Sequence, residues 1–547
     1  MKRTLQFFGL LAGLIIITSQ SINAQVIDII DDGSGTGTTT WNADNIYVLH
    51  GMVFVNNGQT LTIEPGTIIK GAPGTGANAS ALIVARGAKI MAEGTANDPI
   101  IFTFEGDPLD GSVPYDTRGQ WGGVIVLGSG VLNSVPGESA IEGIPTSESR
   151  GLYGGNNDND DSGVIKYVSI RHGGTDIGAG NEINGLTLGG VGSATEIDYV
   201  EIYANNDDGI EFFGGKPNVK HALVVFCADD SFDYDEGFRG NGQFWVTVQD
   251  AVGGVGDRGG EHDGGTDPED GTPYATPTIS NVTYIGRGVD SGKRALTFRD
   301  NAGGFYSNSV FANWGKGTDI EKLGSGQDSY NRFNVGDLSI DNNVYWDVVS
   351  AGGTNAASED LFKVSFADGV NDNGESSVFA ATFNANGNQT GDLGLDYSNV
   401  TPGSNALQLV PNQGPMFGAN TPSNSWFDDV NYKGAFEPNV DAWVKSWTLL
   451  DQMGFLADVV LSVDEIPELQ SKIYPNPAAD VLNIELTENV DLLSVNILDL
   501  SGRLVNNREF KNVNGRIELN INDLISGLYI VSLKTNKASR SFKVFIR

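Results

Sequence analysis

Pairs of acidic residues in the middle of the chain fall into a repeat that would bring their carboxylates together. The segment 207–212, DDGIEF, recurs 22 residues later as DDSFDY at 229–234. Neighbouring coils would place Asp207 over Asp229, Asp208 over Asp230 and Glu211 over Asp233. Carboxylates held this close repel, so they face water, bind a proton or share a cation. The pattern leaves three interpretations open: a calcium site, a catalytic pair, or solvated structural turns.

A second acidic segment has the spacing of a calcium-binding loop. Asp158, Asp160 and Ser162 precede Gly163, at alternate positions that place successive oxygens on one side of a tight turn. The acid expected at the twelfth position is absent, because Ser169 stands there. Either an isolated calcium-stabilised loop or a cluster of Asx turns is expected. The calcium ligands predicted over both segments are Asp158, Asp160, Ser162, Asp207, Asp208, Asp229, Asp230 and Asp233.

Aromatic and ionisable residues alternate with apolar ones around positions 164–171, 196–203 and 218–225. Successive residues of a strand face opposite sides, so one set of side chains should point inward and the other outward. The expected inward set is Val168, Val200, Ala222, Ile170, Ile202 and Val224. The expected outward set is Tyr167, Arg171, Tyr199, Glu201, Tyr203 and His221. Because aromatic faces stack on sugar rings, the outward set predicts a glycan-binding platform; the alternative is an ordinary solvated sheet face.

These side chains need a scaffold that repeats every 21–22 residues. LTIEPGT at 61–67 recurs 21 residues later as LIVARGA at 82–88, and VIVLG at 124–128 follows in the same phase. The segment 295–298 lies 86 residues beyond 209–212, which we interpret as close to four coils. A repeat of this length has room for two or three short strands and their turns, as in a solenoid. The sequence therefore predicts an all-β fold, a right-handed parallel β-helix.

Composition limits the partners of the protein. The 547 residues include 69 acidic and 33 basic ones, a formal net charge of −36, which argues against binding to nucleic acid. Cys227 is the only cysteine, so the chain has no internal disulfide. Residues 1–24 are basic, then apolar, then small and polar, which predicts a secretory signal peptide. We expect an exported mature chain without a membrane span.

Four domains or segments are expected. The signal peptide, 1–24, is followed by a β-helix passenger with acidic loop inserts at 25–456, a linker at 457–471 and a small antiparallel β-sandwich at 472–547. Residues 443–455 have helical character and are predicted to cap the open end of the solenoid. The charge excess belongs to the passenger, because the final segment is nearly balanced.

The final segment carries four ordered motifs: YPNP at 474–477, VNILDLSGR at 495–503, LISGLYIV at 524–531 and FKV at 542–544. Together they resemble the C-terminal type A sorting domain of the type IX secretion system of Bacteroidetes. The resemblance implies recognition by that machinery, export across the outer membrane, and attachment to surface lipopolysaccharide or release. The sorting-motif residues it assigns are Tyr474, Pro475, Asn476, Pro477, Gly527, Tyr529 and Lys543.

The segments 58–67, 92–103 and 119–123 are similar to uncharacterised secreted β-helix proteins of the same bacteria, which carry no established activity. The leading hypothesis is a non-catalytic protein of the cell surface or medium that binds glycan or surface lipopolysaccharide, or that is structural, helped by calcium. The alternative is a polysaccharide lyase or glycoside hydrolase acting on an extracellular polysaccharide. An enzyme requires ionisable groups that converge in a groove.

Overall fold

The computed structural model describes residues 24–177, 182–266, 268–353, 358–458, 469–487, 489–498, 504–522, 524–535 and 539–547. The chain divides into two compact units between residues 459 and 460. The predicted signal peptide lies outside the described residues except for Ala24, and so does most of the predicted linker. The described residues contain no helix long and apolar enough to cross a membrane.

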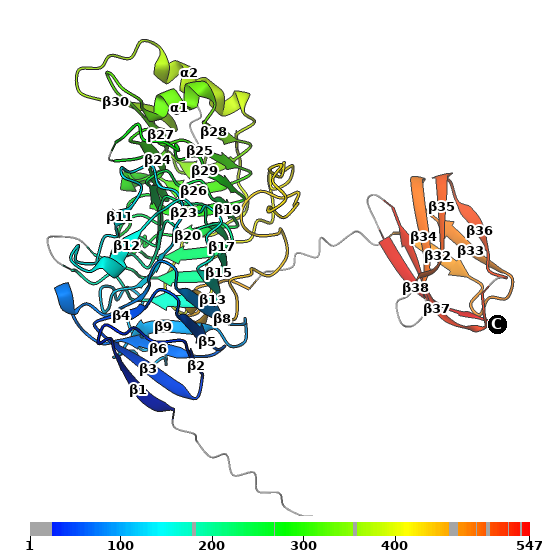
Figure 1. The fold of residues 1–547 in the computed structure, drawn as a ribbon. Helices are drawn as coiled ribbons and strands as arrows, with labels where there is room; N and C mark the ends of the chain where they lie inside the picture. Colours follow the sequence, from blue (N-terminus) through cyan, green and yellow to red (C-terminus); the bar gives the residue numbers. More distant parts are fainter. Residues whose placement is uncertain are drawn as a thin grey trace, which may run out of the picture. The chain divides into compact units, whose positions relative to one another are not determined.

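The larger unit is a parallel β-helix, which confirms the predicted fold class (Figure 1). One side of every coil belongs to a ten-stranded parallel sheet. Its strands are β4 (Met52–Val55), β7 (Ala81–Val84), β10 (Val124–Leu127), β14 (Leu186–Gly189), β16 (Ile210–Phe213), β18 (Phe232–Asp235), β21 (Gly260–Asp263), β24 (Arg294–Arg299), β27 (Lys316–Lys322) and β30 (Phe362–Phe366).

The other two sides of the coils form a 19-stranded sheet, and each side contributes one series of parallel strands to it. Three long strands join the series, and each bends at one residue of left-handed backbone: Tyr167, Tyr199 or His221, with φ of 49°, 53° and 43°. The strands are β1 (Gln25–Ile30), β2 (Thr39–Trp41), β3 (Asn45–His50), β5 (Thr60–Ile63), β6 (Ile68–Gly71), β8 (Lys89–Glu93), β9 (Ile100–Phe104), β13 (Gly163–Arg171), β15 (Glu196–Tyr203), β17 (Asn218–Val225), β19 (Asn241–Gln243), β20 (Val246–Val248), β22 (Thr278–Ser280), β23 (Thr283–Gly288), β25 (Gly304–Ser307), β26 (Val310–Trp314), β28 (Leu338–Asp341), β29 (Val344–Val348) and β31 (Gln389–Thr390).

Apolar side chains from all three sides fill the interior of the coils. Val168 pairs in register with Val200 and then with Ala222, and all three are buried, as predicted for the inward set. Aromatic rings also stack from coil to coil: the ring planes of Phe232 and Trp245 are 4.6 Å apart between centroids and inclined by 16°. Burial of these rings supplies the main stabilising free energy of the unit.

The 22-residue repeat at 207–212 and 229–234 is confirmed, because Glu211 pairs with Asp233 on adjacent strands. Of the repeat predicted nearer the N-terminus, the shared phase of Leu82 and Val124 is confirmed, but the match of Leu61 to Leu82 is wrong. Leu61 pairs with Ile90 in the 19-stranded sheet, whereas Leu82 pairs with Val53 and Val124 in the ten-stranded sheet. The two similar segments therefore lie on different sides of the coil.

The coil count predicted for 295–298 also needs correction. The strand that contains this segment is three coils beyond β16, not four, since β16, β18, β21 and β24 follow one another directly in the ten-stranded sheet. Loops of unequal length between these strands lengthen the repeat.

The helix that caps the core is α2 (Glu375–Ala385), in a region where the sequence shows no clear repeat. Its Phe379 and Phe383 are buried, and their rings lie 5.0 Å and 5.5 Å from those of Phe362 and Tyr345. The predicted capping helix at 443–455 is wrong in length and place. Only α3 (Leu449–Gln452) forms there, and it packs on the outer surface of the coils. The remaining short elements are α1 (Ser329–Val335), β11 (Ser139–Ala140), β12 (Leu152–Tyr153) and 3-10 turns at Gly76–Asn78, Ser149–Gly151 and Val289–Ser291.

Residues 391–456, here called the covering segment, pack against the outer side of the 19-stranded sheet. Leu223, Val225 and Val246 point outward from the coils and are buried in one cluster with Leu450 and Phe455 of the covering segment. This outer face is therefore a second core rather than a solvated surface.

The smaller unit is an antiparallel sandwich, as predicted. One sheet contains β32 (Ser471–Tyr474), β33 (Val481–Leu486) and β36 (Arg516–Asn520). The other contains β35 (Leu504–Val513), β34 (Val490–Leu498), β37 (Gly527–Lys534) and β38 (Ser539–Ile546). Its core includes Leu482, Ile484, Val495, Val531 and Val544.

We predict that Phe383→Ala lowers the free energy of unfolding of the β-helix by about 3–5 kcal/mol, because it removes a buried ring and leaves a cavity at the end of the core. Denaturant unfolding followed by tryptophan fluorescence measures the change. The control is Val378→Ala on the same helix, whose side chain is 52% exposed and whose loss should cost less than about 1 kcal/mol. Equal effects of the two substitutions would show that α2 does not cap the core.

Candidate functional site

The candidate site lies on the outer side of the ten-stranded sheet. Ile210 and Phe212 of β16 point into the core, as do Phe232 and Tyr234 of β18, so the alternate residues Glu211 and Asp233 must point outward. The same alternation on the next strand turns Glu261 and Asp263 outward, because Asp233 pairs with Glu261. Parallel pairing thus stacks Glu211, Asp233 and Glu261 in one file.

The turns before these strands add further carboxylates. Asp208 and Asp230 belong to consecutive coils, and the backbone N–H of Asp230 donates to Asp208 Oδ1 at 2.8 Å. In this region, three sets of carboxylates have oxygens within 4.8 Å of one another. They are Asp207, Asp208 and Asp229; Asp208, Glu211 and Asp233; and Asp229, Asp230 and Asp257. We call these residues, with Asp235, Glu261 and Asp263, the acidic face.

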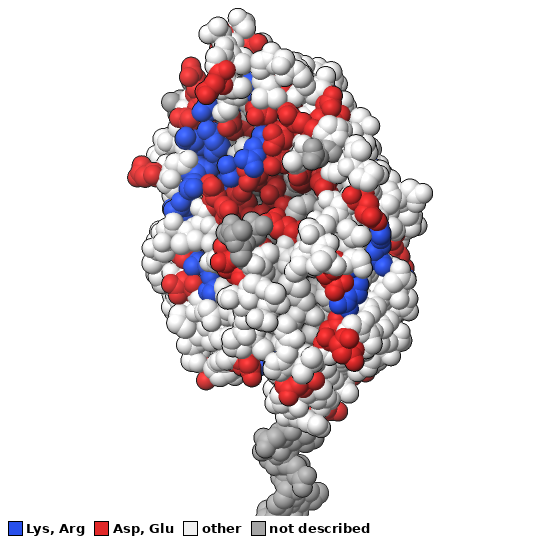
Figure 2. All heavy atoms as spheres, turned by 60° about the vertical axis from the view of Figure 1, so that its left-hand side comes forward, with Lys and Arg blue, Asp and Glu red and all other residues white. Residues whose placement is uncertain are grey.

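Basic residues border the acidic face on the following coils. Arg258 contacts Glu261 at 3.1 Å and Asp230 at 3.3 Å. Arg299 binds both oxygens of Asp263, at 2.7 and 3.0 Å, and contacts Glu261 at 3.0 Å. Lys293 contacts Asp257 at 2.9 Å. Figure 2 shows such a concentration of acidic side chains beside a band of basic ones, in a hollowed part of the surface.

The acidic set that lies apart from the basic residues is Asp208, Glu211 and Asp233. Within the described part of the chain, none of the three has an ion pair with Lys or Arg. Asn184 donates a short hydrogen bond to Glu211, but Asp233 Oδ1 is shielded from solvent and has no hydrogen-bond partner among the described residues. A shielded carboxylate oxygen without a donor is costly, so this set fits a proton or a cation as its missing partner.

Burial and mutual repulsion shift the titration of these groups. The pKa values of Asp208, Glu211 and Asp233 are raised well above the usual range, chiefly because burial removes water from the charged form and secondly because neighbouring carboxylates repel it. The same causes raise the pKa of Asp207 to about 7. These shifts favour the binding of a proton or a cation by Asp207, Asp208, Glu211 and Asp233.

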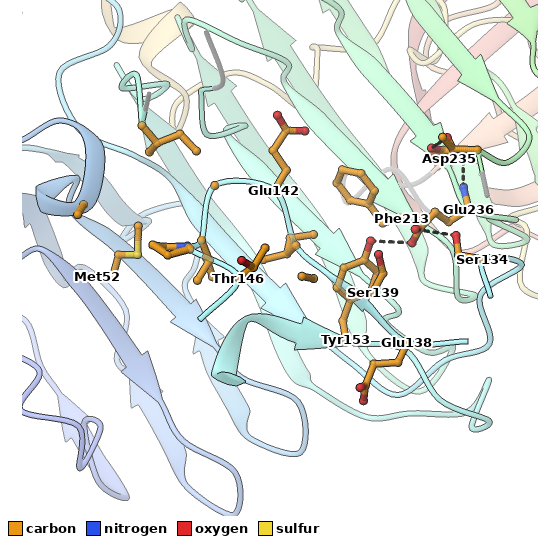
Figure 3. A pocket seen from close by; sticks show the side chains of 18 of the residues that line it. Met52, Ser134, Glu138, Ser139, Glu142, Thr146, Tyr153, Phe213, Asp235 and Glu236 are labelled. Atoms are coloured by element: carbon orange, nitrogen blue, oxygen red, sulfur yellow. Dashed lines mark hydrogen bonds between the residues drawn. The ribbon is translucent and has the colours of Figure 1, made fainter. Parts of the chain in front are cut away.

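A pocket of about 740 Å³ adjoins the acidic face (Figure 3). The short hairpin β11–β12 supplies one wall, and Met52 and Phe213 of the ten-stranded sheet lie on the other side. Glu236 is fixed at one end, where its carboxylate accepts from the hydroxyls of Tyr153 at 2.6 Å and Ser134 at 2.7 Å. Asp235, which belongs to the acidic face, also lines the pocket.

The predicted calcium loop at 158–163 is not arranged for a cation. Arg239 donates to both oxygens of Asp158, at 2.7 and 3.0 Å. Asp160 accepts from the hydroxyls of Ser129 and Ser162, at 2.5 and 3.0 Å. Protein donors thus occupy the oxygens that calcium would need, which corrects the prediction for Asp158, Asp160 and Ser162. The other predicted ligands, Asp207, Asp208, Asp229, Asp230 and Asp233, do lie together on the acidic face.

The predicted glycan platform is not an exposed surface, because the covering segment lies on it. Tyr203 and Glu201 are completely buried, and Arg171 is 2% exposed. The Glu201 carboxylate accepts from the N–H groups of Leu449 and Leu450, at 2.8 and 3.1 Å, and so binds the covering segment to the coil. The sequence correctly suggested that these side chains point away from the interior, but a distant part of the chain covers them.

The stacked column at the bend of the strands is half-buried. The rings of Tyr167, Tyr199 and His221 lie parallel, with centroids 4.4 and 4.2 Å apart. The edge of Trp443 meets Tyr199 and His221, at 5.8 and 5.2 Å. These aromatic faces pack against one another and against the covering segment, so they offer no open surface for a sugar ring.

The predicted sorting-motif residues come together in the smaller unit. Asn476 donates to the backbone oxygen of Lys543 and accepts from the N–H of Phe545, both at 2.9 Å, so the YPNP motif lies beside the last strand. The Tyr529 hydroxyl donates to the backbone oxygen of Ile525 at 2.8 Å. Gly527 pairs with Ile546 across β37 and β38.

Sequence reasoning missed the basic residues Arg258, Lys293 and Arg299. One signal was available for Arg299, because it directly follows the segment 295–298, whose phase matched that of 209–212. Extending that segment by one residue places Arg299 in the file of Asp235 and Asp263. Arg258 and Lys293 lie in turns whose lengths differ from coil to coil, so spacing alone does not place them.

Comparisons with known families agree with this architecture. Residues 33–393, about two thirds of the chain, match a family model described as a pectate-lyase like beta helix domain. Residues 472–547 match a model described as a secretion system C-terminal sorting domain, which confirms the resemblance drawn from the four motifs. No curated protein and no solved structure matches the chain.

We predict that the cation-free protein loses stability as the pH rises from 5 to 8. The folded chain retains protons on carboxyls of raised pKa that the unfolded chain releases near pH 4, so ionisation of the acidic face opposes folding through this range. Asp233→Asn removes one of these charges. In the presence of a chelator, the melting temperature of this variant should exceed that of the unchanged protein by several degrees at pH 8 and by little at pH 5.

The control for this measurement is Asp98→Asn, which removes an exposed charge from a distant turn and should give the same small difference at both pH values. A melting temperature of Asp233→Asn that lies below the unchanged protein at pH 8 would contradict the prediction.

Proposed function

The chain belongs to the family of pectate-lyase-like β-helix domains, and we propose that it binds an anionic polysaccharide through calcium held on its acidic face. The sorting domain makes it a cargo of the type IX secretion system, which delivers it to the cell surface or the medium. An extracellular polysaccharide is the class of partner that such a location makes available.

The observation that carries the proposal is the set Asp208, Glu211 and Asp233. Their oxygens lie within 4.8 Å of one another, none has a basic partner among the described residues, and Asp233 Oδ1 lacks a donor. Calcium takes six to eight oxygen ligands and prefers carboxylates, so the chemistry of this donor set fits it. The set contains neither a sulfur nor a nitrogen ligand, which makes zinc a poor fit.

Calcium there would be held by Asp208, Glu211 and Asp233, with Asp207 or Asp229 at the edge. When bound, it supplies positive charge to which a carboxylate of the polysaccharide can bind. Arg258, Lys293 and Arg299 add positive charge along one border of the same face. Without these two sources, the net charge of −36 would repel a polyanion.

Cleavage of the polysaccharide is a second candidate function, and Asp207 is the observation that favours it. Its pKa of about 7 suits a general acid or base at neutral pH, and it lies at the half-exposed edge of the acidic face. In elimination, a base removes the proton beside the uronate carboxylate, the C4–O bond breaks, and the departing oxygen gains a proton. In hydrolysis, two carboxylates act on opposite sides of the glycosidic bond.

We predict that calcium raises the melting temperature of the mature protein and that polygalacturonate binds only when calcium is present. The double variant Glu211→Gln/Asp233→Asn should weaken calcium binding at least tenfold in isothermal titration calorimetry and abolish retention of the polysaccharide. The matched control Glu64→Gln/Asp98→Asn removes the same number of charges from exposed positions and should leave both unchanged. Calcium affinity that is equal in the two double variants would refute the proposed cation site.

The cleavage candidate has its own test. Unsaturated products absorb ultraviolet light, whereas hydrolysis creates reducing ends without new absorbance, so the two measurements separate the reactions. Either activity should fall at least a hundredfold in Asp207→Asn. If the protein binds uronate polysaccharides in a calcium-dependent way but forms no products from a panel of them, the result supports only the binding function.

A further inference from the structure

The pocket beside the acidic face is suited to a second part of the same ligand (Figure 3). We propose that it binds a neutral sugar that carries a methyl group, such as a 6-deoxyhexose, next to the uronate bound on the acidic face. This inference rests on the proposed function and narrows its ligand to a polysaccharide in which acidic and neutral deoxy sugars alternate.

The pocket is large enough for such a residue and its neighbour. Its volume of about 740 Å³ falls within the range of small-molecule sites. The wall formed by β11 and β12 is an insert between coils, and it turns a sheet face into an open pocket. The buried residues Ile141 and Ile144 of this insert line the pocket, so the wall is anchored by its own apolar contacts.

The pocket and the acidic face share strands β16 and β18, and their residues are two positions apart along each strand. Phe213 follows Glu211 by two positions on β16, and Asp235 follows Asp233 by two positions on β18. Two residues of a strand span about 6.6 Å, which is comparable to one sugar unit. A chain with its uronate over Glu211 and Asp233 therefore places its next sugar over Phe213 and Asp235.

The charges in the pocket exclude an acidic sugar. Among the described residues, no Lys, Arg or His lines it, whereas Glu138, Glu142, Asp235 and Glu236 do. A uronate here would meet four carboxylates, of which only Glu138 has a basic partner, Arg86, among the described residues. Sugar hydroxyls, in contrast, are donors that these carboxylates can accept.

Three of the four carboxylates already accept hydrogen bonds from the protein, and an amino sugar is the competing occupant of the pocket. Glu236 accepts from Tyr153 and Ser134, and Glu138 pairs with Arg86 at 2.6 Å. Asp235 accepts from Thr266 at 3.0 Å. Each oxygen of Glu236 has a further lone pair for a sugar hydroxyl. Because only Glu138 has a basic partner among the described residues, the titrations compare a neutral sugar with an amino sugar directly.

A further part of the lining of the pocket is apolar. Met52, Ile144, Ile177 and Phe213 face the pocket. A sugar with hydroxyls on every carbon would leave some of them without hydrogen bonds against these side chains. A methyl group in place of one hydroxyl removes that penalty and buries apolar surface.

The test compares three calcium-loaded titrations of the full mature chain. The probes are oligogalacturonate, an oligosaccharide of alternating galacturonate and rhamnose, and one of alternating uronate and amino sugar. The alternating deoxy oligosaccharide should bind at least tenfold more tightly than either of the others. Ala140→Trp, which fills the pocket from an exposed position on β11, should abolish this preference, so that the deoxy oligosaccharide binds no more tightly than oligogalacturonate.

The control variant is Ala381→Trp, at an exposed position of α2, which should keep the preference. Tighter or equal binding of oligogalacturonate to the unchanged protein would overturn this inference and leave the proposed function intact. Tightest binding of the amino-sugar probe would also overturn it. Failure of all three probes to bind would overturn the proposed function together with the inference. Because the preference is measured first on the unchanged protein, a folding defect of Ala140→Trp does not remove the test.

Discussion

Backbone hydrogen bonds between successive coils hold equivalent positions of this chain about 4.8 Å apart, and most other properties of the β-helix depend on that spacing. The bonds pair every strand of the ten-stranded sheet in parallel with its neighbours. Each side chain must therefore pack beside the side chain at the same position in the next coil. In the interior these neighbours are apolar side chains or aromatic rings that stack, as the rings of Tyr234 and His262 do. On the outside the same spacing concentrates groups that would otherwise stay apart.

The acidic face is the result of this concentration. Two coils with acids at equivalent positions bring Asp208, Glu211 and Asp233 into one cluster, and the following coils contribute arginines as well as the acids Glu261 and Asp263. Arg258 and Arg299 compensate Glu261 and Asp263, but their contacts do not extend to Glu211 and Asp233. The carboxylates that remain uncompensated are clustered and largely buried, and all their possible ligand atoms are oxygens. This combination is what favours calcium over a purely structural explanation.

The two outer surfaces of the β-helix differ in how far other parts of the chain cover them. On the 19-stranded sheet, outward residues such as Leu223 and Val225 are apolar, and the covering segment buries them together with Tyr203 and Glu201. On β16, β18 and β21 of the ten-stranded sheet, most outward residues are charged, and the insert that carries β11 and β12 leaves a pocket beside them. The difference follows from composition: an apolar face gains free energy when chain covers it, whereas a charged one is better solvated or bound to ligand.

The sequence by itself determined features that depend on short stretches of chain. These include the inward column of Val168, Val200 and Ala222, the stacking of Glu211 over Asp233, the seven-stranded sandwich and the sorting motifs. Each follows from strand alternation or from a repeat in which no long loop intervenes. Only the tertiary structure placed Arg299 over Asp263, covered Glu201 with residues more than 200 positions away, and joined Met52 with Phe213 in one pocket. Loops of unequal length destroy the fixed period there, and packing between distant segments leaves no local pattern in the sequence.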